Sequence, residues 1–530
     1  MSNESAFLAV SPPHDGLGAI DLAVVAVYLA GTFGIALYFS RQHGSTEEFF
    51  LGGRRMPWFA VGLSIMASLL STISYLSTPG ETIKFGVVSF TAIISLPFSI
   101  VLIFWFGVPF FMRLNLTSAY EYLEYRFNYT ARVMAAVLFI FLRLGWMGVV
   151  VYTSSLALSE MSGYEIDSVI LVVGVFATVY TAVGGIRAVI WTDVVQALTL
   201  VLGVIVTIGY IAYVTDSGIG DWWEAAGTVR QEHTSPIIFS WDITIQRTVV
   251  TFAISGFFWI ICTHFSDQVV LQRYFATTSL KAARRSYLVN VVFDTTMMVL
   301  LAVCGLALLH FYTQHPSYLH GGEVSPTEGA DKVFPYFISH QLPAGIGGLI
   351  LAALVAAAMS SIDSGVNSVT AVVTTDLVAR SNRGSGSAAS VRTARILTLV
   401  IGAVATGMAL WVTRIAKNTN IVELMPKGFN MFLGPLSSFF FIGMFLPRVR
   451  AWSAIGGVSC GTACAVIWSY WTELFGPSAE EYRPTFLLAV CAPVVVSMSG
   501  AWLLSFTHGG GRHSGSDYNW WAVVRERSPQ

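Results

Sequence analysis

One apolar stretch, LAALVAAAMSSIDSGVNS at residues 351–368, carries polar side chains at spacings that could hold a cation. Residues three or four apart point the same way from a helix, so one face of the predicted helix presents Ala357, Ser360, Ser361 and Ser364. The carboxylate of Asp363 lies close beside that face. Oxygen ligands suit a small hard cation, whereas zinc and copper prefer nitrogen or sulfur. If this helix lies within a membrane, an ionisable group at that depth indicates a functional site.

Composition predicts a membrane protein. Of the 530 residues 55% are hydrophobic and 11% are charged, and the mean hydropathy is +0.66. A soluble domain has about a quarter of its residues charged, so this chain departs strongly from that class. A net charge of −1 without a dense basic run does not favour a nucleic-acid partner. The five cysteines all lie in apolar stretches, which predicts packing rather than a disulfide framework.

We expect an all-α polytopic fold of about thirteen transmembrane helices, because thirteen apolar runs approach the roughly 20 residues that a bilayer requires. The first run follows a polar tail without Lys or Arg and has no small-residue cleavage site, which indicates an anchor rather than a removed signal peptide. The predicted spans are 18–40, 56–78, 86–113, 131–160, 163–185, 188–214, 244–275, 282–312, 343–379, 391–415, 421–446, 452–474 and 484–507.

The distribution of basic residues predicts the orientation. With the N-terminus outside, most of the 29 Lys and Arg residues fall on the inner side, whereas the outer loops 215–243 and 313–342 carry almost none. An odd number of spans then places the C-terminus in the cytoplasm. We therefore expect a multi-pass protein of the plasma membrane.

Two of the predicted spans are interrupted. The second loses its apolar character in a Ser/Thr cluster and meets Pro79-Gly80, and the seventh contains Ser255-Gly256 and ends in His264, Ser266 and Asp267. Broken helices five spans apart are expected if spans 2–6 and 7–11 form two inverted repeats, and such breaks point to a transporter's binding site. The alternative is that Ser and Gly simply allow close helix packing.

These spans divide the chain into seven predicted parts. They are an external tail (1–17), a peripheral helix with an inner loop (18–55), the first five-helix repeat (56–214), an external loop (215–243), the second repeat (244–446), two peripheral helices (447–508) and a cytoplasmic tail (509–530).

Seven stretches, taken in order, resemble the sodium/solute symporter family along nearly the whole chain. They are WFAVGLSIMASLLS (58–71), TPGETIKFG (78–86), TSAYEYLEYRF (117–127), MGVVVYTSSLAL (147–158), YTAVGGIRAVIWTDVVQ (180–196), DQVVLQRY (267–274) and AAAMSSIDSGVNS (356–368). The greatest similarity is to the branch of sodium-coupled monocarboxylate, iodide and multivitamin transporters. The resemblance implies a thirteen-span protein that moves a small solute with sodium as the coupling ion.

The resemblance also implies a sodium site between the second and ninth spans. Its ligands would be the backbone carbonyls of Ala67, Leu70 and Ala357 and the hydroxyls of Ser360 and Ser361. Carbonyls in an unwound part of a helix are free to coordinate an ion. The alternative is that the two serines bond back to the preceding turn of their own helix.

A second cation is predicted near Asp193, Asp363 and Ser364, where some members of the family have an additional sodium site. Two carboxylates that face one cavity repel each other unless a cation lies between them. The alternative is an aspartate bonded to the backbone or paired with a basic residue, and Arg187 is close in sequence.

The expected solute is a small monocarboxylate-like anion. Sugar-binding relatives carry polar side chains where this chain has Leu69, Ser74, Ala92 and Ile93, and iodide carriers have glutamine at the position of Ser74. A neutral sugar or amino acid remains an alternative. The residues that could line the cavity are Ser71, Ser74, Arg143, Trp146, Trp259, His264 and Lys427.

Two of these cavity candidates could bind a carboxylate, and each has a structural alternative. Arg143 could grip a carboxylate at two points, or it could pair with Asp294. Lys427 could pair with the solute, or it could form a surface pair with Glu423 one turn earlier.

Other classes of protein are less consistent with the chain. An enzyme would need a nucleophile–base pair or a metal triad such as HExxH, and neither appears. A membrane sensor would need more than the short tail after residue 508, and no obligate protein partner is indicated. Proton coupling through Asp193, Asp363 or Asp294 is an alternative to sodium coupling.

Overall fold

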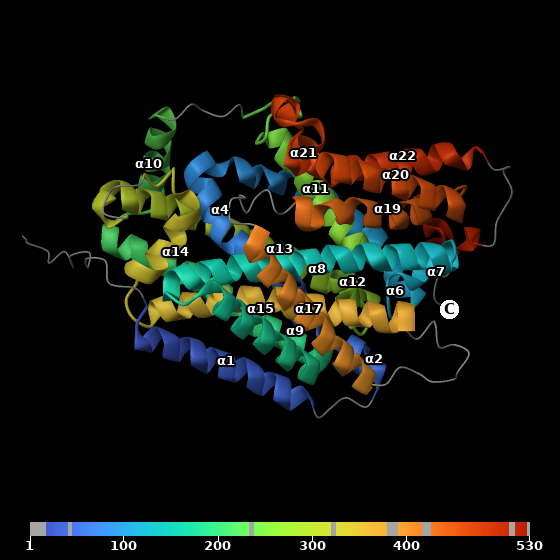
Figure 1. Cartoon of the computed structure of the whole chain (residues 1–530), viewed down its shortest axis with the longest axis horizontal. Helices are drawn as coiled ribbons and strands as arrows, with labels where there is room; N and C mark the ends of the chain where they lie inside the picture. Colours follow the sequence, from blue (N-terminus) through green and yellow to red (C-terminus); the bar gives the residue numbers. More distant parts are fainter. Residues whose placement is uncertain are drawn as a thin grey trace, which may run out of the picture.

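The regular elements of the protein are helical throughout the part of the chain that the structure describes. This computed structural model describes residues 17–40, 45–232, 238–319, 325–378, 391–415, 426–507 and 515–526 (Figure 1). Within these residues ten helices are long and apolar enough to cross a membrane. An all-α membrane fold is therefore confirmed, whereas the count of thirteen spans stays a prediction.

The long helices lie side by side, with shorter helices at the two ends of the bundle (Figure 1). The helices that carry the argument below are α1 (Ala19–Ser40), α3 (Trp58–Leu69), α4 (Thr72–Phe85), α8 (Tyr129–Ser162), α9 (Ile166–Thr215), α11 (Val249–Ser266), α12 (Gln268–Phe275), α13 (Leu280–Gln314), α15 (Ile346–Val372), α17 (Val391–Ile415), α19 (Met431–Phe445), α20 (Ala451–Ser469) and α22 (Cys491–Ser505). Shorter segments include η2 (Gly86–Ser95), α5 (Leu96–Leu102), η3 (Ile103–Gly107), α6 (Val108–Leu114), η8 (Pro426–Asn430) and α21 (Trp471–Phe475).

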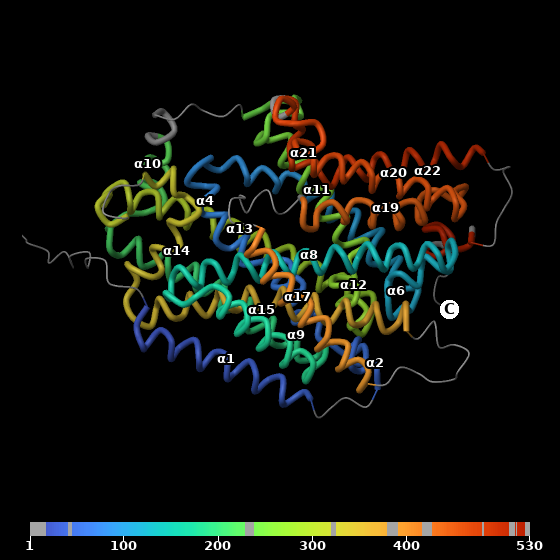
Figure 2. The backbone as a smooth tube through the Cα atoms, in the orientation of Figure 1, coloured from blue at the N-terminus to red at the C-terminus, as the bar shows by residue number. Residues whose placement is uncertain are grey.

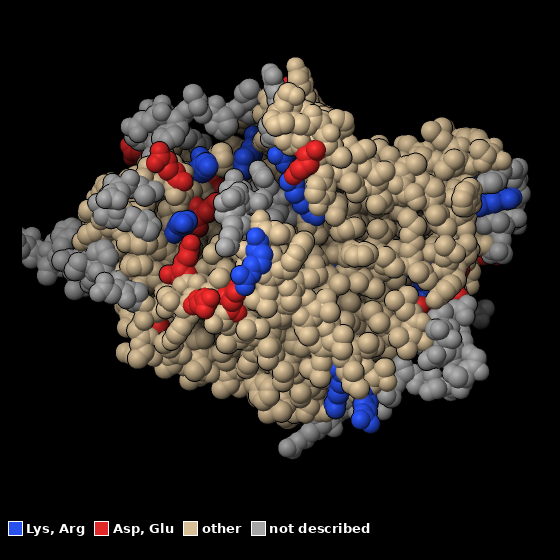
Figure 3. Space-filling view, viewed as in Figure 1, with Lys and Arg blue, Asp and Glu red and all other residues tan. Residues whose placement is uncertain are grey.

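α15 is the central helix of the bundle. It packs against α9, α8, α1 and α17. In the most apolar 18-residue stretch of this span, 89% of the residues are buried by the rest of the protein. In Figure 2, α1 runs along one edge of the bundle, and the pair α20 and α22 runs along the opposite edge. The surface over α19, α20 and α22 shows few charges in Figure 3, as expected for helices that face lipid.

Two predicted spans are interrupted by one or two extended residues, and their glycines and prolines lie elsewhere within helices. α3 ends at Leu69, and Leu70 (φ −81°, ψ 106°) and Ser71 (φ −91°, ψ 165°) are extended before α4 begins. Asp267 (φ −81°, ψ 118°) separates α11 from α12 in the same way. The prediction of a broken second and seventh span is therefore confirmed.

The breaks occur at residues that can cap the helix that follows. Ser71 Oγ accepts a hydrogen bond from the Ser74 backbone N–H, and Asp267 Oδ1 accepts one from Val269 at 2.9 Å. By contrast, Pro79 lies within α4 and Gly256 within α11. A Cβ on Gly256 would lie 3.1 Å from the Cβ of Ala92, so this glycine serves close packing against η2.

The predicted fifth and sixth spans both lie within α9, which consists of two helices joined by a sharp kink at Gly185. Gly185 has φ 58° and ψ −168°, a backbone conformation that is essentially restricted to glycine. The bend redirects the second half of α9, which carries Asp193 toward α3 and α15.

We expect Gly185→Ala to destabilise the protein by about 1–3 kcal/mol, because a Cβ strains this backbone conformation. Gly209→Ala is the matched control, since Gly209 lies in the same helix with nothing within 4 Å of its added Cβ. Thermal unfolding in detergent should show a lower midpoint for Gly185→Ala and an unchanged or higher one for Gly209→Ala. Equal midpoints would contradict the role given to Gly185.

Candidate functional site

The break between α3 and α4 lies against the middle of α15. Ser360 Oγ, on α15, donates to the carbonyl of Ala67 at 2.8 Å, and it also lies 3.0 Å from the carbonyl of Ala357. Thr72, at the start of α4, donates to the carbonyl of Leu354 at 3.3 Å. Three of the five residues expected to bind sodium are therefore joined through a single hydroxyl group.

The other two residues of that set, Leu70 and Ser361, present oxygens that are not used in helical hydrogen bonds. The Ser361 hydroxyl is buried and has no hydrogen-bond partner in the described part of the chain. Leu70 is extended, so its carbonyl belongs to neither helix. A buried hydroxyl without a partner costs about 1–3 kcal/mol. Neutral carbonyl and hydroxyl oxygens of this kind fit a small hard cation.

A second polar cluster, formed by Ser64, Asp193, Arg273 and Ser364, lies further along the same helices. Arg273, on α12, donates to Ser64 Oγ at 2.7 Å, to Asp193 Oδ2 at 2.9 Å and to Ser364 Oγ at 2.5 Å. All four side chains are at most 1% exposed. The basic partner of Asp193 is therefore Arg273 and not Arg187, which bonds to the carbonyl of Gly52.

Asp363 is connected to this cluster by hydrogen bonds and has no ion pair with a basic side chain among the described residues. Its carboxylate accepts hydrogen bonds from the hydroxyl of Tyr180 and from Ser364 Oγ, the latter at 3.1 Å. The sequence reasoning missed both Arg273 and Tyr180. The position of Arg273 in the family motif DQVVLQRY, directly after the polar end of the seventh span, is the signal that could have identified the first of them.

Arg143 is engaged in an ion pair, but with a different partner from the one expected. It pairs with Asp267 through two nitrogens, with Nε 3.1 Å from Oδ1, and both side chains are almost fully buried. The structural alternative for Arg143, an ion pair, is therefore what the structure shows, but the partner suggested for it, Asp294, is wrong. Asp267 is the residue that breaks the seventh span, so Arg143 of α8 holds that break in place.

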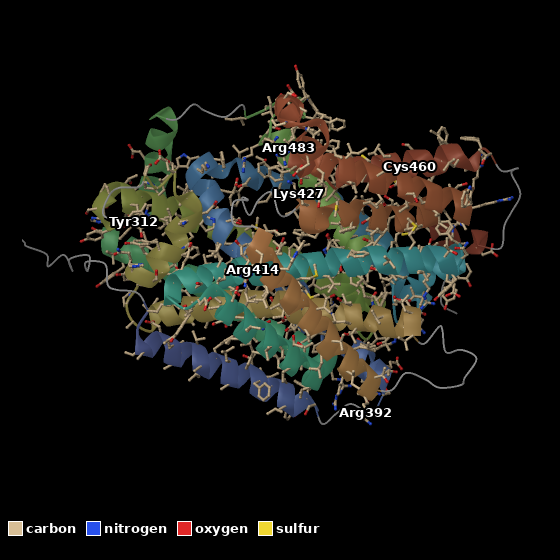
Figure 4. All side chains as sticks on the ribbon, viewed as in Figure 1. Tyr312, Arg392, Arg414, Lys427, Cys460 and Arg483 are labelled. Atoms are coloured by element: carbon tan, nitrogen blue, oxygen red, sulfur yellow. The ribbon has the colours of Figure 1, made fainter. Side chains whose placement is uncertain are left out.

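Two further candidates for the cavity are also committed to other contacts. Lys427 pairs with Glu473 of α21, and Figure 4 shows it near Arg483 at the α21 end of the bundle. The alternative partner, Glu423, lies outside the described residues. His264 is 3% exposed, and its Nδ1 lies 2.7 Å from the Tyr274 hydroxyl.

A cavity of about 270 Å³ lies beside the first helix break, and most of its wall is apolar. Leu69, Ser74, Ala92 and Ile93 all lie on this wall, as do the expected Trp146 and Trp259. Ser71, Arg143, His264 and Lys427 are not among its lining residues. Leu70 borders the cavity and also belongs to the candidate sodium site, so the two are adjacent.

Four polar groups on this wall are available to a ligand. Asp294 has no hydrogen bond or ion pair within the described residues, and it carries the one charge among the side chains that line the cavity there. Ser89 Oγ, Trp146 Nε1 and Asn430 Oδ1 are buried without partners in the same part of the chain. Convergent polar groups in an apolar cavity are typical of a binding site for a small organic molecule.

Two broken helices, one of them interrupted beside a cavity, in a bundle of membrane-spanning length are typical of a secondary transporter. The sodium:solute symporter family model matches residues 49–461, so the chain belongs to that family. Among its relatives, the sodium/sialic acid symporter SiaT of Proteus mirabilis is 32% identical over 468 residues, which cover 87% of this chain and 91% of the relative. Human sodium-coupled monocarboxylate transporter 1 is 28% identical over 483 residues, which cover 88% of this chain and 76% of the relative.

A solved structure supports the same assignment. The substrate-bound outward-open state of a Na⁺-coupled sialic acid symporter superposes with a TM-score of 0.80 at 29% identity, covering 94% of this chain and all of that one. The expected family, sodium as the coupling ion and a small-molecule solute as cargo are confirmed. Members of this family are transporters, which agrees with the absence of an enzyme motif in the sequence.

We expect Arg143→Met to destabilise the protein by about 3–5 kcal/mol, because it leaves the Asp267 carboxylate buried without its partner. The double variant Arg143→Met, Asp267→Asn removes both charges and should recover much of that loss. Thermal unfolding in detergent measures both effects. An unfolding midpoint for Arg143→Met equal to that of the unmodified protein would show that the pair does not hold the break.

Proposed function

We propose that this protein couples the uptake of a small organic solute to sodium by alternating access. The sodium site is formed by Ala67, Leu70, Ala357, Ser360 and Ser361. The observation that supports it best is the Ser360 hydroxyl between the carbonyls of Ala67 and Ala357, beside the unpartnered Ser361 hydroxyl. Sodium at this position would tie α15 to the break between α3 and α4.

Coupling follows from the residues that the two sites share. Leu70 contributes a carbonyl to the sodium site and also borders the solute cavity, and Leu69 and Ser74 flank it on the cavity wall. Sodium that orders this break also completes the cavity wall. A ligand shifts a conformational equilibrium by its differential affinity for the two states, and the effect of one ligand on the other is reciprocal.

The direction of transport depends on orientation. We place the N-terminus outside and the C-terminus in the cytoplasm of the cell membrane, because this arrangement puts most Lys and Arg residues inside. Sodium then enters from the outer side, and the low internal sodium concentration empties the site and frees the solute.

For the solute, a sialic acid is a better candidate than a small monocarboxylate. The relatives named for sialic acid are 32% and 30% identical, whereas the monocarboxylate transporters are 28% and 27% identical. The cavity has no basic side chain among its described lining residues, so the carboxylates of lactate and of a sialic acid both lack an ion-pair partner there. The difference between the two solutes lies in their hydroxyl groups, of which lactate has only one. A sialic acid is a carboxylated sugar with several hydroxyl groups, which can donate hydrogen bonds to Asp294 and accept them from Ser89 and Trp146.

A solute with an ammonium group is the second candidate, and one specific observation favours it. The unpaired Asp294 carboxylate shares the cavity with the aromatic rings of Phe90, Trp146, Trp259 and Phe429. Aromatic faces and a carboxylate are the groups that bind organic cations. The same cavity could therefore select a positively charged amine.

We expect Ser361→Ala to lower sodium affinity and sodium-driven uptake roughly tenfold or more, because it removes an oxygen ligand. Ser368→Ala is the matched control, since this buried serine of the same helix bonds only to the carbonyl of Gly365 at 3.0 Å. Sodium titration of the purified protein and uptake into proteoliposomes test both variants. Normal sodium dependence in Ser361→Ala would refute the assigned site.

The charge of the solute is tested by Asp294→Asn, with the exposed neighbour Thr296→Val as the control. Removing the negative charge should lower the affinity for a solute with an ammonium group roughly 10- to 100-fold, because hydrogen bonds to charged groups contribute about 1.5–3 kcal/mol. Uptake of a sialic acid should be retained or improved. Sodium-dependent uptake and thermal shifts with sialic acid, lactate and ethanolamine, whose primary ammonium group can donate a hydrogen bond to Asp294, separate the candidates. Equal responses to all three would refute a role for Asp294.

A further inference from the structure

The end of the bundle at which α6 lies is filled by a cluster of aromatic rings, which we call the aromatic plug. The plug joins α6, α19 and the segment around α7 (Glu121–Arg126). Its rings are fully buried, with centroids 5.0 to 6.0 Å apart, and they belong to Phe110, Phe111, Tyr120, Tyr122 and Phe440. Phe440 lies about three turns further along the chain than Asn430, which borders the cavity.

Residues 515–526, which we call the strap, contact the same elements. The strap contains η11 (Ser516–Tyr518), which packs against α7, and η12 (Ala522–Glu526), which packs against α6. Figure 1 shows the C-terminus at this end of the bundle. In the orientation proposed above, this end faces the cytoplasm.

Trp520 makes the most specific contact of the strap. Its Nε1 donates a hydrogen bond to the carbonyl of Phe106 at 3.1 Å, and the centroids of the two rings are 4.9 Å apart. Phe106 belongs to η3, a π-helical turn within the predicted third span, and such turns are frequent at functional sites. Four residues after Trp520, the carbonyl of Val524 accepts a hydrogen bond from Arg113 of α6.

The strap also contacts the other two elements of the plug. The ring of Tyr518 stacks on Tyr125 of α7 with centroids 5.5 Å apart. Trp521 lies edge-on to Phe445, the last residue of α19, at 6.4 Å. Val523 of the strap is fully buried. One short segment therefore bridges α6, α7 and α19, the three elements that close the plug.

The predicted third span connects the plug to the cavity. Its last part, α6, contributes Phe110 and Phe111 to the plug. Its first part, formed by η2 and the start of α5, contributes to the cavity wall the residues Ser89, Phe90, Ala92, Ile93 and Leu96. A contact that fixes η3 and α6 therefore acts on the same span that lines the cavity.

We propose that the strap holds the aromatic plug closed, and that Trp520 is a positioning residue for transport. Alternating access requires the helices to separate at each end of the bundle in turn. The strap bridges three elements that separate when this end opens, so its docking favours the form in which this end is closed. The proposal rests on the alternating access described under "Proposed function".

The test measures how fast a buried cysteine reacts with a water-soluble maleimide. Ser437→Cys is the reporter for the plug, because Ser437 is fully buried in α19 and its Oγ lies 2.8 Å from Ser266 Oγ of α11. Thr82→Cys is the reporter for the opposite end, since Thr82 is buried in α4 beyond the first break. Both are introduced into the full-length protein with its five natural cysteines replaced by alanine, and labelled in detergent.

Trp520→Ala should raise the labelling rate of Ser437→Cys roughly tenfold, because the lost contacts shift the equilibrium toward the form that is open at this end. Labelling of Thr82→Cys should be unchanged or slower. Tyr518→Ala should act in the same direction through a separate contact. Trp502→Ala is the matched control and should change neither rate, since Trp502 is 50% exposed on α22 and stacks within its own helix.

An unchanged labelling rate of Ser437→Cys in the strap variants would overturn the proposal. An equal rise for Thr82→Cys would also overturn it, because a general loosening of the protein exposes both reporters. If Trp520→Ala does not fold, Tyr518→Ala decides in the same assay. Labelling rates that do not respond to sodium in any variant, with the effect of the strap intact, would instead count against the proposed sodium coupling, so the two failures are distinguishable.

Discussion

Interrupting a helix inside an apolar bundle frees backbone groups that lipid cannot satisfy, and the rest of this structure follows from that constraint. At the first break, Ser71 caps α4, and Ser360 of α15 binds the carbonyl of Ala67. At the second break, Asp267 caps α12, and Arg143 of α8 balances its charge. Each break is therefore stabilised by a side chain from a distant helix, which makes the relative position of the helices part of the site.

This dependence explains how the proposed sodium site and the cavity can be coupled. The residues of the first break face α15 on one side and the cavity on the other, with Leu70 common to both. The second break is tied to the first through Arg273, which bonds to Ser64 in α3. The two broken helices are thus linked to each other through buried side chains.

Much of the fold and part of the site could be predicted from the sequence. Apolar runs of membrane length, the family motifs and the two broken spans were sufficient for the all-α fold and for sodium as the coupling ion. Of the features that predicted the breaks, the Ser/Thr cluster beginning at Ser71 and the polar end of the seventh span at Asp267 mark their positions. Pro79 and Gly256, by contrast, are tolerated within their helices. What decides the position is the capping side chain together with the helix that packs against it, and local composition contains only the first of these.

The partners of the buried charges could not be predicted in the same way. The sequence by itself determined which ionisable groups lie in apolar helices, since Arg143, Asp193, Asp294 and Asp363 all stand in such stretches, and it determined the serine face of α15 from helical spacing. Only the tertiary structure decided that Arg143 pairs with Asp267 and that Arg273 pairs with Asp193. It also decided that Asp294 lines the cavity without an ion-pair partner among the described residues. An ion pair joins residues 124 and 80 positions apart in these two cases, and such pairing depends on the packing of whole helices. Helical periodicity specifies the direction of a side chain around its own axis, but the neighbour that it meets is specified by the fold.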